Sequence, residues 1–169
     1  MSVLSSTVMT RGVVFVHSTP AALCPHVCWA LESVLGENVR LDWSAQPLGR
    51  SLVRGEFSWA GEPGTGARLA SALRGFDDLR YEVTEEPSPG VDGSRWVHTP
   101  ALGIHHSWLA ANGDAVVNED RLRAAMRSGD HTALRREIDS ALGTAWDLEL
   151  DPFRHAGEGH PTRWLYRVS

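Results

Sequence analysis

The 169-residue chain contains no lysine, and all sixteen of its basic residues are arginine. This absence excludes mechanisms that need a lysine amine, such as Schiff-base chemistry and the lysine of a phosphate-binding P-loop. No basic run occurs and the formal net charge is −5, so the electrostatic footprint of a nucleic-acid-binding protein is missing. No window approaches the roughly 18 apolar residues of a membrane span. We therefore expect neither nucleic acid nor a membrane as a partner.

Cysteine is almost as scarce, with only Cys24 and Cys28. A helix N-terminus favours the thiolate, which permits a redox or nucleophilic Cys24, but redox helices carry C-x-x-C rather than this wider spacing. No second pair of cysteine or histidine with ligand spacing completes a tetrahedral site. We expect two inert thiols, no metal and no cofactor.

The N-terminal segment lacks the charged region and following apolar stretch of a secretory signal. We therefore expect a cytoplasmic protein without structural disulfides. Residues 1–10 are small and polar, which predicts a flexible N-terminus, and the chain starts at either Met1 or Met9.

The hydrophobic period changes regularly between residues 12 and 84. Continuous apolar runs predict buried strands, alternation predicts half-buried strands, and helical spacing predicts amphipathic helices. The resulting order is strand, helix, two strands, helix, strand, which is that of a ferredoxin-like split β-α-β unit. The predicted segments are a central strand buried on both faces at Gly12–His17, a helix from Cys24-Pro25 to Gly36, strands at Val39–Ser44 and Val53–Trp59, a helix at Gly64–Gly75 and a strand at Leu79–Val83.

Residues 86–169 show turn signals, a hairpin pattern and two helix caps. We predict one α+β domain over residues 11–169, with the ferredoxin-like unit at 11–85 and a β-hairpin-rich, two-helix C-terminal extension at 86–169. The segments are a linker at 85–94, a hairpin of Arg95–His98 and Gly103–Leu109, a short strand at Ala115–Val117, helices capped by Asn118 and Asp130, irregular chain after Gly143 and a last strand at Trp164–Val168. The predicted inner residues of the two helices are Leu122, Ala125, Met126, Leu134, Ile138 and Leu142.

Histidine, glutamate, arginine and tryptophan crowd residues 95–109 and 153–164. If the hairpin turn is Thr99–Leu102, His98 and His105 face each other across the two strands, but such a pair binds a metal ion only with a third ligand. We therefore interpret the histidines of the hairpin as amphipathic side chains on a half-exposed face rather than as metal ligands. The alternative is an enzyme with a His/Glu acid–base site between the 95–109 hairpin and the 153–164 tail, which must then meet in space. Its candidate residues are His98, His105, His155 and Glu158.

The turn before the second predicted helix is rich in glycine. Free N–H groups at a helix N-terminus attract anions, and a nearby arginine adds positive charge. The spacing is not that of a P-loop, and Glu62 opposes an anion, so a tight turn with a threonine cap is the competing interpretation. The candidate anion-binding residues are Gly64, Thr65, Gly66 and Arg68.

One face of the predicted sheet alternates arginine with acidic side chains, and the aromatic side chains point to the other. We expect cross-strand ion pairs worth about 0.2–1 kcal/mol each on the charged face. The stacking aromatics of an RNA-reading sheet are absent there. Solvent, the C-terminal third or a second subunit covers this face. The charged residues are Arg40, Asp42, Arg54, Glu56, Arg80 and Glu82, and the aromatic ones are Trp43, Phe57, Trp59 and Tyr81.

Several segments together resemble a family of actinobacterial proteins of unknown function and of about this length. They are Thr10–Ser18, Ala22–His26, Gly61–Gly75, Glu85–Gly90, Asn118–Arg123, Pro152–Arg154, Ala156–Gly159 and Arg163–Leu165. The resemblance runs from about residue 10 to the end, and Cys28 departs from the pattern. It implies a stand-alone cytoplasmic protein from a GC-rich organism, in agreement with the missing lysine, and it transfers no catalytic residue.

No catalytic motif is complete in the sequence. We therefore expect a non-enzymatic cytoplasmic protein that is regulatory or binds a small, anionic ligand, an expectation that rests in part on fold analogy. Trp29 lies on the polar side of its predicted helix, where it forms part of a contact surface or packs under the C-terminal segment, and buried aromatic residues dominate interfaces. We expect a homodimer, formed through the charged sheet face or through Trp29.

Overall fold

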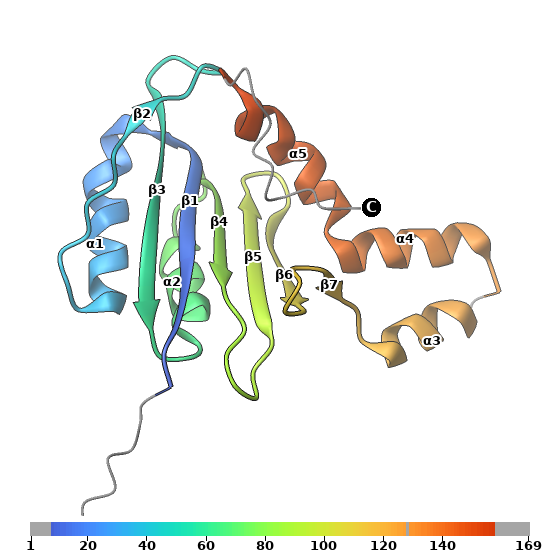
Figure 1. The fold of residues 1–169 in the computed structure, drawn as a ribbon. Coiled ribbons are helices and arrows are strands. Elements are labelled where there is room, and N and C mark those ends of the chain that lie inside the picture. Colours follow the sequence, from blue (N-terminus) through green and yellow to red (C-terminus); the bar gives the residue numbers. More distant parts are fainter. Residues whose placement is uncertain (1–7, 128, 158–169) are drawn as a thin grey trace, which may run out of the picture.

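The structure, a computed structural model, describes residues 8–127 and 129–157 (Figure 1). Within them, seven strands form one antiparallel sheet of order β2-β3-β1-β4-β5-β6-β7. The elements in chain order are β1 (Thr10–Pro20), the 3₁₀ helix η1 (Ala21–Leu23), α1 (Cys24–Leu35), β2 (Ser44–Ala45), β3 (Leu52–Gly61), α2 (Thr65–Leu73), β4 (Arg80–Glu85), β5 (Gly93–Thr99), β6 (Gly103–Leu109), β7 (Ala115–Val116), α3 (Glu119–Arg127), α4 (His131–Leu142) and α5 (Thr144–His155). The α+β class is therefore as predicted.

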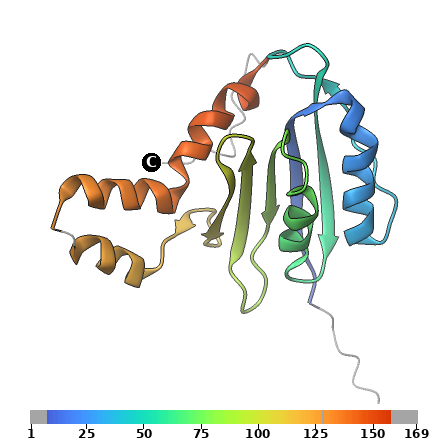
Figure 2. The same ribbon diagram turned by 180° about the vertical axis from the view of Figure 1, so that it is seen from behind.

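Helices α1 and α2 pack on one face of the sheet and enclose the main core (Figure 2). Leu31 of α1 and Leu69 of α2 are fully buried in this core. Trp59 and Tyr81 point into the same core, as the alternation predicted. Helix α1 ends at Gly36, whose φ of 71° is the left-handed conformation that favours glycine at this position.

The two strands that lead into and out of α1 differ from their predictions. Strand β1 is central, but Val13, Phe15 and His17 are only partly covered, so burial on both of its faces is wrong. The predicted strand Val39–Ser44 shrinks to β2. The Glu32 carboxylate accepts a hydrogen bond from the N–H of Val39 at 3.1 Å and holds this backbone beside α1 rather than in the ladder.

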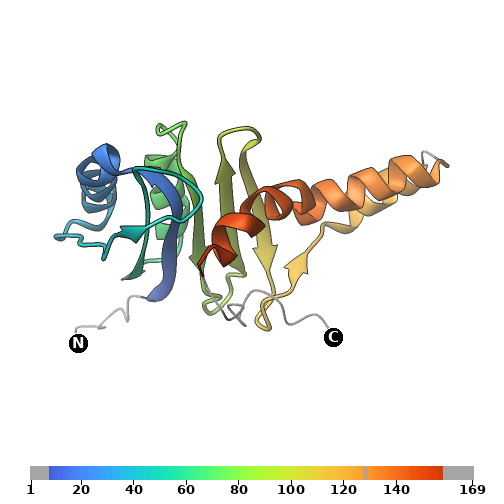
Figure 3. The ribbon, with the colours of Figure 1, turned by 90° about the horizontal axis from the view of Figure 1, so that it is seen from above.

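The chain after Gly143 forms α5, where irregular structure was predicted. Pro152 lies inside this helix, and proline argues against a helix interior. The side chains toward the sheet nonetheless keep helical spacing, with Trp146 half-buried and Leu150 and Arg154 buried. Figure 3 shows α5 on the face opposite to α2.

Helices α3 and α4 form an arm that extends away from the sheet (Figures 1 and 3). Asn118 and Asp130 accept hydrogen bonds from the N–H groups of Asp120 and Thr132 at 2.8 and 2.9 Å, so both predicted helix caps are confirmed. Three of the residues that were predicted to face inward are exposed instead: Met126 is 68% exposed, and Ile138 and Leu142 are also exposed. The two helices of the arm pack mainly against each other, and the only residues buried in them within the described chain are Ala125 and Ala141.

Among the described helices, none has both the length and the apolarity that a membrane span requires. The predicted strand Trp164–Val168 lies outside the described residues.

Candidate functional site

A cluster of charged side chains lies between the sheet and α5. Glu82 on β4 is fully buried and accepts hydrogen bonds from His17 on β1 at 2.8 Å, from Arg95 on β5 at 2.8 Å and from Arg154 on α5 at 2.7 Å. Asp147, also on α5, accepts from both arginines, at 2.6 and 2.9 Å. Two carboxylates thus hold two arginines and His17, and these five residues come from β1, β4, β5 and α5. We call them the charge cluster.

The cluster fixes the charge of its central carboxylate. Burial by itself raises the pKa of Glu82, but the hydrogen bond from His17 and the charges of Arg95 and Arg154 outweigh it. The pKa of Glu82 therefore lies well below its ordinary value. A carboxylate that stays ionised at every physiological pH does not exchange a proton as a general acid or base near neutrality.

Further contacts attach α5 to the same face of the sheet. Trp146 donates to the carbonyl of Gly103 at 2.9 Å, and the hydroxyl of Thr99 donates to Glu149 at 2.7 Å. Arg80 lies with its guanidinium 4.2 Å from the ring centre of Phe153. The hydrogen bonds of the cluster join α5 to three strands of the sheet, and Glu82 at its centre is fully buried. We interpret the charge cluster as the group that docks α5 on the sheet.

This arrangement corrects part of the prediction for the charged sheet face. Glu82 does pair with Arg95 on the neighbouring strand β5, but this pair is buried and Glu82 also pairs with Arg154 of α5. Arg80 lies 3.6 Å from Glu149 of α5, and Arg54 donates to the carbonyl of Ala156 at 2.8 Å. The C-terminal third therefore covers this part of the face, which removes it as a surface for a second subunit. The signal in the sequence was the helical spacing of Trp146, Leu150 and Arg154, which Pro152 concealed.

The carboxylate of Glu85 occupies the predicted anion site. Both oxygens of Glu85 accept hydrogen bonds at 2.7 Å, one from the N–H of Gly64 and the other from that of Gly66. Thr65 is the first residue of α2 rather than its cap, and its hydroxyl accepts from Arg68 at 2.9 Å. An external anion would have to displace Glu85, so the anion site stays a prediction that this geometry does not favour.

The role of Glu85 leads to a stability prediction. Replacing Glu85 by alanine leaves two N–H groups of a helix N-terminus without their acceptor, and we expect the free energy of unfolding to fall by about 1.5–3 kcal/mol. Urea denaturation followed by circular dichroism measures this. The matched control is Glu62→Ala in the same turn, an exposed side chain whose loss should change stability by less than about 0.5 kcal/mol. Equal effects of the two substitutions would contradict the capping role.

The candidate histidines of the alternative enzyme are not brought together. His98 pairs with Ile104 and His105 with Val97, so the two histidines lie on opposite faces of the sheet and the predicted facing is wrong. His98 is buried against Tyr81, with its Nδ1 2.8 Å from the carbonyl oxygen of Leu79. Among the described residues no group of three histidine, cysteine or carboxylate side chains could hold a metal ion.

The remaining members of that set are also distant. His105 packs against Trp146 near the start of α5, with ring centres 4.8 Å apart, whereas His155 is the last residue of α5. His155 lies nine positions after Trp146 in this helix, which is roughly 13 Å of helix rise. Glu158 lies outside the described residues. The geometric support for the acid–base alternative is therefore missing.

Cys24 lies at the start of α1, where a reactive thiolate was one interpretation. Burial raises the pKa of this thiol, and the neighbouring Cys28 raises it further. This is the opposite of the lowered pKa that a nucleophilic or redox cysteine needs. Both cysteines carry free thiols.

A group of aromatic side chains that is exposed in part lies on β5 and β6, beside Val116 of β7. The ring of Trp96 stacks on His106 at 5.0 Å, and His106 meets Trp108 edge-on at 4.8 Å. Trp108 is 50% exposed and pairs across the strands with Val116, which is 44% exposed. We call Trp96, His106, Trp108 and Val116 the aromatic strip.

The aromatic strip exists because the helical cover stops short of it. In Figure 2, α1 and α2 lie over the β3-β1-β4 part of the sheet, and no helix of the described chain crosses the same face of β6 and β7. Burial lowers the pKa of His106, and its Nε2 lies 3.2 Å from the hydroxyl of Ser94. The strip therefore offers a neutral, aromatic surface beside a polar group.

Trp29 on α1 is the other exposed tryptophan predicted as a contact residue. It is 60% exposed and meets His26 edge-on at 5.1 Å. Its exposure is as predicted.

The chain belongs to a family whose description is a protein of unknown function, DUF3145, and the match covers residues 13–167. No curated protein and no solved structure matches the chain. The class is thus an α+β domain of a family without an assigned activity.

Proposed function

We propose that this protein is a non-enzymatic regulatory protein that acts by binding another protein through the aromatic strip. The single observation that carries the proposal is the half-exposed Trp108, flanked by His106 and Val116 on a part of the sheet that no described helix covers. Contiguous exposed apolar patches are typical of interaction sites, and tryptophan is enriched among the residues that dominate binding energy.

The shape of the surface favours a protein over a small ligand. Small-molecule sites are concave and enclose most of the ligand, whereas the strip lies on an open sheet face. A sheet face with aromatic side chains at its centre and polar groups at its edge resembles the anatomy of a protein–protein interface. The small anionic ligand at Gly64–Arg68 is not part of this proposal, because Glu85 binds the same N–H groups.

We further infer a ferredoxin-like split unit over about residues 11–85. Support comes from the chain order β1-α1-β2-β3-α2-β4 together with the spatial order β2-β3-β1-β4. Two free thiols one helical turn apart support a reducing, cytoplasmic compartment. The complete replacement of lysine by arginine supports a GC-rich, actinobacterial source.

The chain supplies a matched pair of variants for testing the proposal. Trp108→Ala removes the centre of the strip, and Trp29→Ala removes an equally exposed tryptophan from α1. We expect Trp108→Ala to weaken capture of the partner more than about tenfold, since truncating a central tryptophan typically costs 2 kcal/mol or more. Trp29→Ala should leave capture unchanged.

The measurement is quantitative mass spectrometry of proteins retained from the source lysate by wild-type and variant chains. Both variants should keep the thermal midpoint of wild type, since each removes an exposed side chain. A retained set that is identical for wild type and Trp108→Ala, or one that depends on Trp29 alone, would contradict the proposal.

A further inference from the structure

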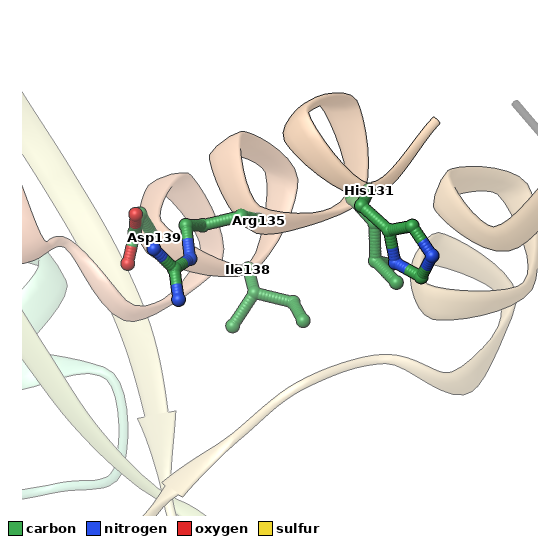
Figure 4. A pocket seen from close by; sticks show the side chains of 5 residues that line it. His131, Arg135, Ile138 and Asp139 are labelled. Carbon is green, nitrogen blue, oxygen red and sulfur yellow. The ribbon is translucent and has the colours of Figure 1, made fainter. Parts of the chain in front are cut away.

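Helix α4 carries an apolar stripe that the described chain does not cover. Leu134, Ile138 and Leu142 recur every four residues and so lie along one side of the helix. Ile138 is 36% and Leu142 is 39% exposed, and Leu134 is half-buried. Figure 4 shows the shallow groove beside this stripe, with Ile138 between Arg135 and His131.

Helix α3 does not cover the stripe because it packs against another side of α4. Arg121 of α3 donates to the hydroxyl of Ser140 at 3.0 Å and lies 3.7 Å from Glu137. The residues of α4 that face α3 are therefore Glu137, Ser140 and the buried Ala141. The stripe lies to one side of this contact with α3 rather than in it, on an arm that extends from the body of the molecule.

We propose that the stripe is the contact surface of a homodimer, in which α4 packs antiparallel against α4 of a second copy about a two-fold axis at Ile138. A two-fold interface is self-complementary, so each residue must meet a suitable residue of the same helix. With the axis at Ile138, this residue meets itself and Leu134 meets Leu142 of the partner subunit. The apolar stripe thus closes on itself without an unmatched position.

The charges beside the stripe are complementary in the same register. Arg135 precedes Ile138 by three residues and Asp139 follows it by one, on the same side of the helix. The antiparallel register brings Arg135 beside Asp139 of the partner subunit, twice in each dimer. Within the described chain Arg135 forms no ion pair, and Asp139 accepts only a long hydrogen bond from Thr144 at 3.4 Å. Both side chains are therefore available to a second copy.

The charge of the arm as a whole also favours a second copy of this chain. Two molecules with a net charge of −5 repel each other, but the arm contributes nothing to that charge. Its five basic residues are Arg121, Arg123, Arg127, Arg135 and Arg136, and its five acidic residues are Glu119, Asp120, Asp130, Glu137 and Asp139. Contact through the arm avoids the repulsion that other faces of the molecule would meet.

The contact is small, which sets its expected strength. One pair of packed helices lies at the low end of the size range of specific interfaces, so we expect a dissociation constant on the order of 10 µM. The inference concerns a different surface from the aromatic strip and does not depend on it.

Analytical ultracentrifugation of the full chain from about 1 to about 500 µM, a range that brackets this constant, tests the proposal. Wild type is expected to shift from 18.5 kDa toward twice that mass as its concentration rises. Ile138→Asp should weaken the dimer more than about tenfold, because it places two carboxylates at the two-fold axis. Leu148→Asp on α5 is the matched control, with a 71% exposed leucine that lies off the stripe, and it should dimerise like wild type.

A charge exchange separates this register from other contacts through α4. Arg135→Asp alone brings like charges together across the axis and should weaken the dimer, and the double variant Arg135→Asp/Asp139→Arg should restore it. Circular dichroism confirms that each variant keeps its helices. A monomer at every concentration, a dimer that is insensitive to Ile138→Asp, or a failure of the double variant to restore it would each overturn the proposal.

Discussion

Replacement of Glu82 by glutamine is expected to lower the free energy of unfolding by about 3–5 kcal/mol, the usual cost of removing one partner from a buried ion pair. The substitution keeps the shape of the side chain and removes the buried carboxylate that Arg95 and Arg154 share, so that of their two acceptors only the partly exposed Asp147 stays charged. Urea denaturation at pH 7 measures the loss. The control is Glu86→Gln, whose exposed pair with Arg11 should contribute less than about 1 kcal/mol.

We also expect the stability difference between wild type and Glu82→Gln to depend on pH. Glu82 has a lowered pKa in the folded protein, so its contribution is fully present above the pKa of an unfolded glutamate, about 4.3, and is lost as the pH falls below that value. The difference in free energy of unfolding between wild type and Glu82→Gln should therefore shrink between about pH 5 and about pH 3, the range around the pKa of about 4.3 of an unfolded glutamate. A difference that stays constant over this window would contradict the assignment of an ionised, paired Glu82.

Replacement of Gly12 by alanine is expected to destabilise the protein by more than about 3 kcal/mol, beyond the ordinary cost of overpacking a core. A Cβ at this position of β1 would overlap the carbonyl oxygen of Thr84 on β4 and lie 2.8 Å from a ring carbon of Trp59. Backbone on the neighbouring strand cannot move away as a side chain does, so the central sheet must distort.

Gly75 supplies the control for this prediction, because a Cβ there meets nothing within 4 Å. Gly75→Ala should change the free energy of unfolding by less than about 1 kcal/mol. Both variants are compared by urea denaturation, and by soluble yield if Gly12→Ala does not accumulate. Similar stabilities of the two variants would show that β1 and β4 are not packed as closely as described.

Local signals in the sequence predicted the elements whose ends are set locally. Asn118 and Asp130 cap their helices, and Gly36 and Gly143 end theirs, because hydrogen bonds and backbone conformation at these positions involve near neighbours only. The alternation of β4 likewise predicted which side of the sheet Tyr81 faces.

Contacts between distant segments were less predictable. The environment of Glu82 depends on α5, and one proline inside that helix hid its period. Glu85 was assigned to a linker because nothing near it in the chain shows that it reaches α2. The pairing of His98 with Ile104 differs by one residue from the predicted hairpin register, and in a strand such a shift moves a side chain to the other face.

The differences between the predicted and the observed contacts decide which surfaces are candidates for function. The charged face that the sequence offered to a second subunit is occupied by α5, and the histidines offered to catalysis are apart. Within the described residues, the aromatic strip and the arm are two of the surfaces that stay exposed. We propose that the protein acts through these two surfaces, on β5, β6 and β7 and on α3 and α4, and we interpret the charge cluster as stabilising.

The central claim is that partner binding takes place on the aromatic strip. Photo-crosslinking in living cells, with a photoreactive amino acid at position 106 or, in a separate chain, at position 29, tests it most directly. We expect a discrete heavier product from position 106 that disappears when Trp108→Ala is added, and no such product from position 29. A product from position 29 alone, or one from position 106 that persists with Trp108→Ala, would contradict the account.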